Sequence, residues 1–394
     1  MAIGDVIVGI DIRASRTSLI VGEVNSFNQI EVVCSTSTKS NGIQKGKIIN
    51  EAALAETLKK VVEDAEKEMD ITINSAYITI PGKHVTIVQN SVTKEAKDKY
   101  SGISTRDVLT ALLAAKAIEI PENKQIIDII TNDFVLDDGK EVKNPVGSFA
   151  SSFTLDCQII LGDEEYLKVL RNVFKKANIE IDGYVPIVLA EKNLMLEESE
   201  QKDSVMLLDV GAQQINIGVF FGERMIYTNA IDVGGDNITN DIAIVLGISF
   251  EEAEKLKKQY SLALRSYIDN DTEVVLSTSE IIEARVEQMF DLINKDITNK
   301  GLKSEINTVV LTGQEILSIS KSDMVGKITL NIPVKASTGK IAGLIKPNYA
   351  TAYGLVRYIA TRPFSKNISS SVDKEKNESF LKKLLYKIKE FFYS

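Results

Sequence analysis

Each half of this chain opens with the same short pattern of an apolar run, an acid, a turn and a second apolar run. In the first half, residues 6–10 form the apolar run that leads to Asp11. In the second half, residues 205–208 form the run that leads to Asp209. Apolar runs bounded by turn signals are typical of buried strands. Because two unrelated hairpins would give the same pattern, the repetition favours a duplicated α/β fold without establishing it.

Duplicated strand–acid–turn–strand units that face each other across a cleft are the layout of the actin, heat-shock-protein and sugar-kinase superfold. In that layout the backbone N–H groups of the two turns hold nucleotide phosphates, and the acids hold Mg²⁺ directly or through water. A third element fits, because the β-rich run 307–311 ends at Thr312 and Gly313, where the superfold places the nucleoside.

Five sequence blocks along the chain form a distinctive set. They are Val-Gly-Ile-Asp at 8–11, Ser-Asn-Gly-Ile-Gln-Lys-Gly at 40–46, Val-Gly-Gly-Asp-Asn at 233–237, Ile-Ile-Glu-Ala-Arg at 281–285 and Asn-Tyr-Ala-Thr-Ala-Tyr-Gly-Leu at 348–355. Together they resemble the FtsA family of bacterial cell-division proteins. The order and spacing match from about residue 5 to residue 362. The resemblance implies an α/β, actin-like fold with two domains built on the duplicated core and an α+β subdomain inserted in the first half.

The resemblance also implies a division of the chain into six parts. These are a first actin-like domain (1–83 and 163–200), an inserted FtsA-type subdomain (84–162), a second actin-like domain (201–232 and 301–362), a peptide-binding subdomain (233–300), a flexible linker (363–379) and an amphipathic helix (380–394). Within the second half, the residue pattern predicts a helix capped by Asp236, a strand at 273–276 before a helix from 278, and a strand near 327–334.

Ten residues match the nucleotide-binding motifs of the family and are its implied nucleotide contacts. They are Asp11, Ser15, Arg16, Asp209, Gly211, Gly234, Gly235, Asp236, Thr312 and Gly313. Any Mg²⁺ would be held through the nucleotide. No residue is assigned a catalytic role.

The phosphate turns depart from the family at several positions. Arg13 stands where the pattern has glycine, the second turn reads Gly-Ala-Gln-Gln-Ile-Asn at 211–216, and Gln314 and Glu315 follow Gly313 in place of glycines. Side chains therefore stand where bare backbone normally approaches phosphate. The sequence leaves open whether ATP with Mg²⁺ binds, and whether Arg13 neutralises a phosphate or takes its place. It predicts no enzyme activity beyond a very weak ATPase.

The C-terminal segment is basic and amphipathic. Its apolar residues fall on one arc of roughly 140° at about 100° per residue, and they are Phe380, Leu381, Leu384, Leu385, Ile388, Phe391 and Phe392. Lys382, Lys383 and Lys387 lie on the other side. A bilayer span needs about 20 apolar residues, so the pattern predicts a helix lying in the interface of an anionic membrane. The alternative is a terminal helix folded back onto the body.

Composition excludes several other classes of function. Two cysteines, Cys34 and Cys157, and one histidine, His84, are too few for a Cys/His metal site and fit a reducing cytoplasm. The net charge of −9 disfavours nucleic acid as a partner. We see no signal peptide and no spanning segment, so the sequence predicts a peripheral protein on the cytoplasmic face of the inner membrane.

The resemblance implies three partners: the C-terminal peptide of the tubulin-like division protein FtsZ, further copies of this chain in a filament, and the membrane. Arg285 and Lys295 lie in the implied peptide-binding subdomain and are the candidate contacts for an acidic peptide. Two other readings remain open at this point. One is an actin-like component of type IV pilus assembly, which lacks such a tail, and the other is a phosphotransferase or ATPase of the same superfold.

Overall fold

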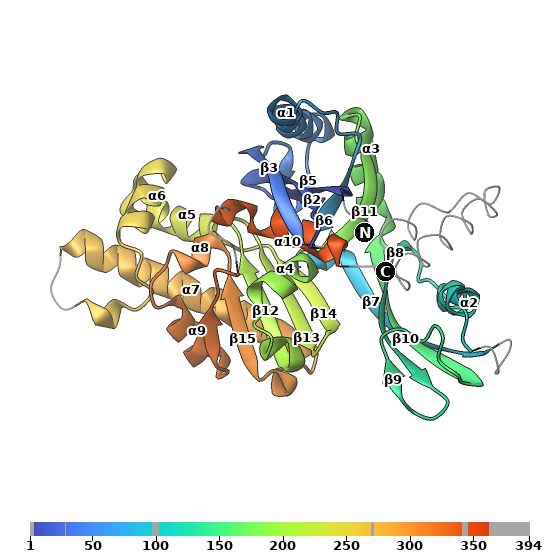
Figure 1. Cartoon of the computed structure of the whole chain (residues 1–394). Coiled ribbons are helices and arrows are strands. Elements are labelled where there is room, and N and C mark those ends of the chain that lie inside the picture. Colours follow the sequence, from blue (N-terminus) through green and yellow to red (C-terminus); the bar gives the residue numbers. More distant parts are fainter. Residues whose placement is uncertain (1–3, 28, 97–101, 269–271, 341–345, 362–394) are drawn as a thin grey trace.

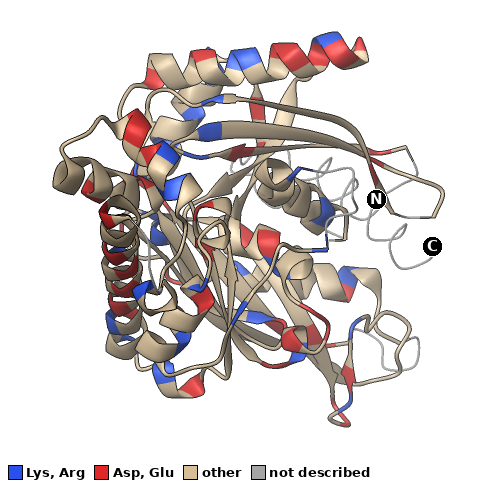
Figure 2. Ribbon diagram, turned by 90° about the vertical axis from the view of Figure 1, so that its left-hand side faces the viewer, with Lys and Arg blue, Asp and Glu red and all other residues tan. Residues whose placement is uncertain are grey.

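A computed structural model describes residues 4–27, 29–96, 102–268, 272–340 and 346–361. Figure 1 shows two halves, each built around a sheet, with a third, smaller sheet at one end. Charged residues lie mostly on the outer helices and loops rather than on the sheets (Figure 2). The predicted linker and amphipathic helix, 363–394, lie outside the described residues.

The first sheet has five strands in the order β11-β6-β1-β2-β3. Their bounds are β1 Val6–Ile12, β2 Arg16–Val24, β3 Ile30–Lys39, β6 Ser75–Ile80 and β11 Glu180–Pro186. Helices α1 (Glu51–Met69) and α3 (Glu164–Lys176) pack against each other, with α1 on β2 and β3, while α10 (Ala350–Ala360) packs on β1 and β2. Because helices cover both faces, β1 and β2 are nearly continuous apolar runs.

The second sheet repeats the connections of the first. Its order is β14-β13-β12-β15-β16, with β12 Ser204–Val210, β13 Ile215–Phe221, β14 Arg224–Ile231, β15 Thr308–Thr312 and β16 Val334–Ala336. In both sheets three antiparallel strands are followed by two strands parallel to the first. The duplication expected from the two acid-ended runs is therefore confirmed.

Two helices pack together between the halves. Helix α4 (Ile187–Met195) contacts α10 along its length. A Cβ built on Gly354 of α10 would lie 2.4 Å from the carbonyl oxygen of Ala190. Only glycine permits this approach, which brings side chains of both helices to the floor of the cleft between the sheets.

The inserted segment forms its own four-stranded sheet in the order β7-β10-β8-β9. The strands are β7 Val85–Glu95, β8 Lys124–Leu136, β9 Glu141–Val142 and β10 Ser152–Asp163, and helix α2 (Thr105–Ala115) packs on β7 and β10. A separate apolar core that includes Phe134, Phe153 and Leu155 lies between them. A short hairpin, β4 (Ile43–Gln44) and β5 (Lys47–Ile48), belongs to the first half.

The second half also carries a group of helices. They are α5 Gly235–Leu246, α6 Phe250–Gln259, α7 Glu273–Asn299, α8 Gln314–Leu317 and α9 Ser322–Leu330. Apolar side chains of α5 and α7, such as Ile242 and Phe290, join the core of the second sheet. No helix within the described ranges has both the length and the apolar character needed to cross a bilayer.

Three sequence-based predictions are wrong in this region. Residues 273–276 begin α7 instead of forming a strand, because Val275 is buried at helical spacing with Thr278, Ser279 and Ile282. The first half of the strand expected near 327–334 is the end of α9, which is capped by Asn331 in the left-handed conformation (φ 54°), and strand β16 begins only at Val334. Helix α5 begins at Gly235 with Gly234 as its cap, so Asp236 is already inside it.

Candidate functional site

The two hairpin acids meet in the cleft between the halves. Asp11 near the end of β1 and Asp209 near the end of β12 are 5% and 3% exposed. They line a pocket of about 130 Å³, far below the roughly 300–1,000 Å³ typical of small-molecule sites. Seven of the ten predicted nucleotide contacts line it, namely Asp11, Ser15, Arg16, Asp209, Gly211, Thr312 and Gly313.

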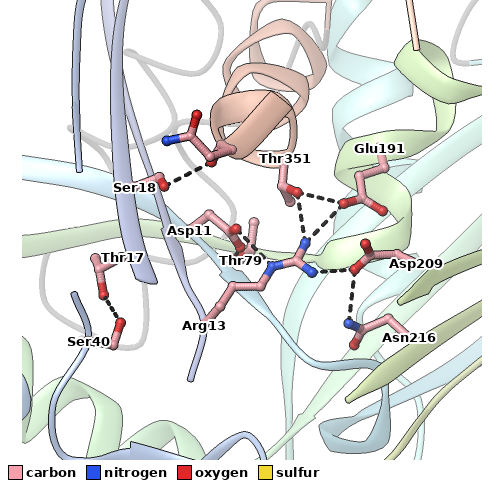
Figure 3. Close-up of polar contacts among 11 residues, drawn as sticks. Asp11, Arg13, Thr17, Ser18, Ser40, Thr79, Glu191, Asp209, Asn216 and Thr351 are labelled. Carbon is pink, nitrogen blue, oxygen red and sulfur yellow. Dashed lines mark hydrogen bonds and ion pairs between the residues drawn. The ribbon is translucent and has the colours of Figure 1, made fainter. Parts of the chain in front are cut away.

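Arg13 occupies the centre of this cluster and bridges the two halves (Figure 3). Its Nε donates to Asp11 Oδ2 at 2.9 Å, and its Nη1 donates to Asp209 Oδ2. Its Nη2 donates to Glu191 Oε1 at 3.0 Å and to Thr351 Oγ1 at 2.7 Å. Four hydrogen bonds from one guanidinium therefore join β1, β12, α4 and α10.

The buried charges adjust their protonation to each other. Burial alone would lower the pKa of Arg13, but the carboxylates of Asp11, Asp209 and Glu191 outweigh it and raise that pKa above its ordinary value. Burial, together with the charge of Asp209, raises the pKa of Glu191 to about 8. At neutral pH the cluster thus holds one guanidinium, two carboxylates and a protonated Glu191.

Hydroxyl and amide side chains complete the cluster. Thr79 Oγ1 donates to Asp11 Oδ1 at 2.6 Å, and Thr351 Oγ1 donates to Glu191 Oε1 at 2.6 Å. Asn216 lies directly opposite Asp209 across the hairpin and donates to Asp209 Oδ2 at 3.2 Å. A carboxylate at position 216 would place a second negative charge there, so the amide suits this arrangement.

We predict that Glu191→Gln flattens the pH dependence of stability between about pH 5 and 8. The folded protein holds a proton on Glu191 up to about pH 8, whereas the unfolded chain releases it near the ordinary value of 4.5. Folding stability that Glu191 contributes is therefore full at low pH and is lost as pH rises, by up to about 1.4 kcal/mol per pH unit. Urea unfolding of both proteins across this range measures the difference. Parallel curves would contradict the raised pKa.

The second phosphate turn is closed by the start of α5. The backbone N–H of Gly235 donates to the carbonyl oxygen of Gly211 at 3.1 Å, and that of Asp236 donates to Ala212 at 2.7 Å. A Cβ on Gly234 would lie 2.3 Å from the same Gly211 oxygen. Gly234, Gly235 and Asp236, predicted as nucleotide contacts, are not among the residues that line the pocket. They instead bond to the backbone of the turn, because the N–H groups at the start of a helix need acceptors.

The glutamines of the second turn are also engaged with protein. Gln213 Nε2 donates to Asp236 Oδ2 at 2.9 Å, while its Oε1 accepts the backbone N–H of Lys45 from the first half at 3.0 Å. Gln214 Nε2 donates to Asp232 Oδ1 at 2.9 Å. Lys83 Nζ lies 2.6 Å from the same Asp232 oxygen. These contacts form a second bridge between the halves at the edge of the cleft.

Sequence reasoning missed Glu191, Thr351 and Thr79 as members of the site. Glu191 had a detectable signal, because it is a charged residue within the otherwise apolar segment 187–191 that begins α4. Thr351 lies within the block 348–355 that carried the family resemblance. Thr79 carried no signal, since threonine is common in buried strands.

The residues present do not fit ATP and Mg²⁺ in the manner of this fold. A guanidinium already lies between the acids that would hold the ion. Side chains of Arg13, Gln213 and Gln214 stand in the turns, and the carboxylate of Glu315 lies over Gly235, 2.2 Å from the position of a Cβ. In this structure Arg13 takes the central place between the two acids.

The two predicted peptide contacts differ in their surroundings. Arg285 on α7 pairs with Asp241 on α5, with Nε–Oδ2 at 2.5 Å and Nη2–Oδ1 at 2.7 Å. This pair staples the two helices together. Lys295 lies exposed further along α7. Of the two, Lys295 is the better placed to meet a partner.

Comparison with known proteins identifies relatives over most of the chain. The family model described as cell division protein FtsA matches residues 206–354, and the SHS2 domain inserted in FtsA matches residues 82–161. The chain is 28% identical to the FtsA of Borreliella burgdorferi, covering 98% of this chain and 99% of that protein. It is 26% identical to the FtsA of Bacillus subtilis, covering 89% of this chain and 82% of that protein.

Solved structures with the same fold are more distant in sequence. The chain is similar to a structure described as the PilM-PilN type IV pilus biogenesis complex, with a TM-score of 0.60, 14% identity, and 91% of this chain and 99% of that chain covered. It is similar to MreB5 of Spiroplasma citri, with a TM-score of 0.51, 12% identity, and 93% and 99% covered. These likenesses show an actin-like fold. The two family models and the full-length relatives show that the chain belongs to the FtsA family of cell division proteins.

Proposed function

We propose that this protein is a peripheral adaptor that holds the FtsZ ring at the cytoplasmic face of the inner membrane during cell division. In this role residues 233–300 bind the C-terminal peptide of FtsZ, residues 380–394 bind the anionic membrane, and copies of the chain assemble into filaments. Catalysis is not part of the role, since the turns that would act on a phosphate chain are filled with side chains.

The observation that carries this proposal is that the packing of α5 on α7 uses apolar side chains that do not line the cleft. Ile238 and Ile242 of α5 pack with Val286, Met289 and Phe290 of α7 in the core of the second half. None of these side chains contributes to the pocket that Arg13 fills. Loss of a phosphate site therefore leaves a folded surface available for a partner.

The same segment exposes apolar residues beside charged ones. Ile244 and Val245 at the end of α5 are 70% and 63% exposed, and Phe250 at the start of α6 is 43% exposed. Singly exposed apolar residues are ordinary, but three within seven positions suit a partner peptide that is both apolar and acidic. The exposed Lys295 on α7 supplies positive charge to the same segment.

The test is titration of the full-length protein with a synthetic FtsZ C-terminal peptide in a calorimeter. We expect modest affinity that falls as salt is raised, because exposed charges mostly steer the encounter. Lys295→Glu should weaken binding several-fold without lowering the melting temperature. Lys60→Glu makes the same change at an exposed position of α1 and should leave binding unchanged.

Arg285→Glu is the informative contrast within the same helix. Because Arg285 is paired with Asp241, its reversal should lower stability and so affect binding only indirectly. If no heat appears at low salt and no amide signals of residues 233–300 shift with peptide, the adaptor role would have to be abandoned.

A further inference from the structure

We propose that Arg13 is a built-in replacement for the divalent cation of this fold, so that the two halves are held together without any nucleotide. This inference goes beyond the adaptor role and does not depend on which partner or membrane the protein binds. It rests on the position of Arg13, the charge balance around it and the use of the surrounding donors.

The first argument is position. The two acids come from equivalent places in the duplicated sheets, because each lies next to the last residue of a strand that begins a hairpin. A group that binds both acids must lie between the two halves. The Arg13 side chain lies there, 19% exposed, and contacts both acids while its backbone belongs to the first half. It is therefore a crosslink between the halves and not a surface ion pair.

The second argument is charge. With Glu191 protonated, one guanidinium faces two carboxylates, which leaves the cluster with a net charge of −1. A phosphate chain entering here would add several negative charges beside carboxylates that no metal ion shields. Buried like charges repel strongly where water is scarce. The arrangement therefore suits a cation supplied by the chain and opposes an anionic ligand.

The third argument is the use of donors. A guanidinium has five N–H groups in a planar fork, and Arg13 makes four hydrogen bonds with them. The N–H groups of Gly235 and Asp236 at the start of α5 are given to the second turn. Arg13 keeps one N–H beyond these four bonds, and the two helix-start N–H groups are already used, so few donors remain for a phosphate chain.

The central experiment is a double-mutant cycle on Arg13→Ala and Asp209→Asn, followed by thermal unfolding of the full chain. Arg13→Ala should lower the midpoint by several degrees because it leaves two buried carboxylates without a counter-charge. The double variant should be more stable than Arg13→Ala alone, because one of those carboxylates is gone. Arg16→Ala removes an arginine from the same turn, but within the described residues its side chain makes one hydrogen bond, to Ser37, so the midpoint should change little.

Addition of Mg·ATP to the wild-type protein tests the nucleotide directly. A nucleotide that binds the folded protein and is present at about a hundred times its Kd would raise the thermal unfolding midpoint by several degrees. We expect Mg·ATP to cause no such shift. If Arg13→Ala does not fold well enough to measure, Arg13→Lys replaces it. Arg13→Lys keeps the positive charge but loses the planar guanidinium, so its unfolding midpoint should be lower than that of the wild type while the protein still folds.

Spin labels on the two halves supply a readout independent of stability. Lys60→Cys on α1 and Lys255→Cys on α6 are exposed sites, and the natural Cys34 and Cys157 are buried. The distance between the labels should be the same with and without Mg·ATP in the wild-type background. The proposal would be overturned if the stability changes of Arg13→Ala and Asp209→Asn simply added in the double variant. A saturable rise of the wild-type midpoint with Mg·ATP, or a nucleotide-dependent change in the distance, would also overturn it.

Discussion

Deletion of residues 380–394 is expected to reduce binding to anionic liposomes at least a hundredfold and to leave the rest of the protein folded. The seven apolar residues of this segment would contribute on the order of 10 kcal/mol if fully buried. Interfacial insertion is partial, and ordering a short helix costs part of that gain. The segment has four lysines, Lys382, Lys383, Lys387 and Lys389, and each adds about 1 kcal/mol near an anionic surface. A hundredfold loss corresponds to about 2.7 kcal/mol, well within this range.

Co-sedimentation with vesicles of defined composition measures the effect. Leu384→Glu places a charge in the middle of the apolar arc and should behave like the deletion, whereas Tyr386→Gln on the polar side should not. Neutral vesicles should bind less of the intact protein than anionic ones. Equal co-sedimentation of the intact and deleted proteins would remove the basis for a membrane anchor.

Lys257→Met is expected to destabilise the helical part of the second half by about 3 kcal/mol, the low end of the range for breaking a buried ion pair. Lys257 is 2% exposed, and its Nζ lies 2.8 Å from Glu254 Oε2 and 3.0 Å from Glu315 Oε2. The two acids raise the pKa of Lys257 despite the opposing effect of burial. Without the lysine they would repel each other, although each keeps some contact with water, which limits the cost.

Urea unfolding together with hydrogen exchange of α5 and α6 would locate this loss. Lys258→Met is the matched control, because that lysine is 70% exposed and pairs with the same Glu254. An exposed pair contributes less than about 1 kcal/mol. Adding Glu315→Gln to Lys257→Met should recover part of the stability. A loss no larger than that of Lys258→Met would show that the buried lysine is not needed for charge balance.

Elements whose apolar residues recur with a clear period were predictable from the sequence. Elements whose structure depends on contacts distant in the sequence were not. The apolar positions of α1, such as Leu54, Leu58 and Val61, recur at helical spacing and are buried. The start of α7 carries Val274 and Val275 near Leu276, a run with high strand propensity. Packing of Val275 and Ile282 on the same helical face overrides that local preference.

The location of the site was predictable, but its full membership and its bonding were not. The duplicated pattern located Asp11 and Asp209, and their meeting follows from the equivalent topology of the two sheets. The sequence also located Arg13 as a departure from the family pattern. It could not place Glu191 and Thr351 around the guanidinium, because these residues lie 178 and 338 positions away and reach it only through the packing of α4 on α10.

The bonding of α5 to the second turn makes the loss of a phosphate site hard to reverse. Replacing Arg13 alone would leave two acids opposed, and replacing Gln213 alone would leave the turn still closed by the N–H groups of Gly235 and Asp236. Each single substitution toward an open turn would lower stability, and only several substitutions together would restore phosphate binding. The arrangement therefore acts as an evolutionary ratchet, because each intermediate on the way back to an open turn would be less stable than the present protein.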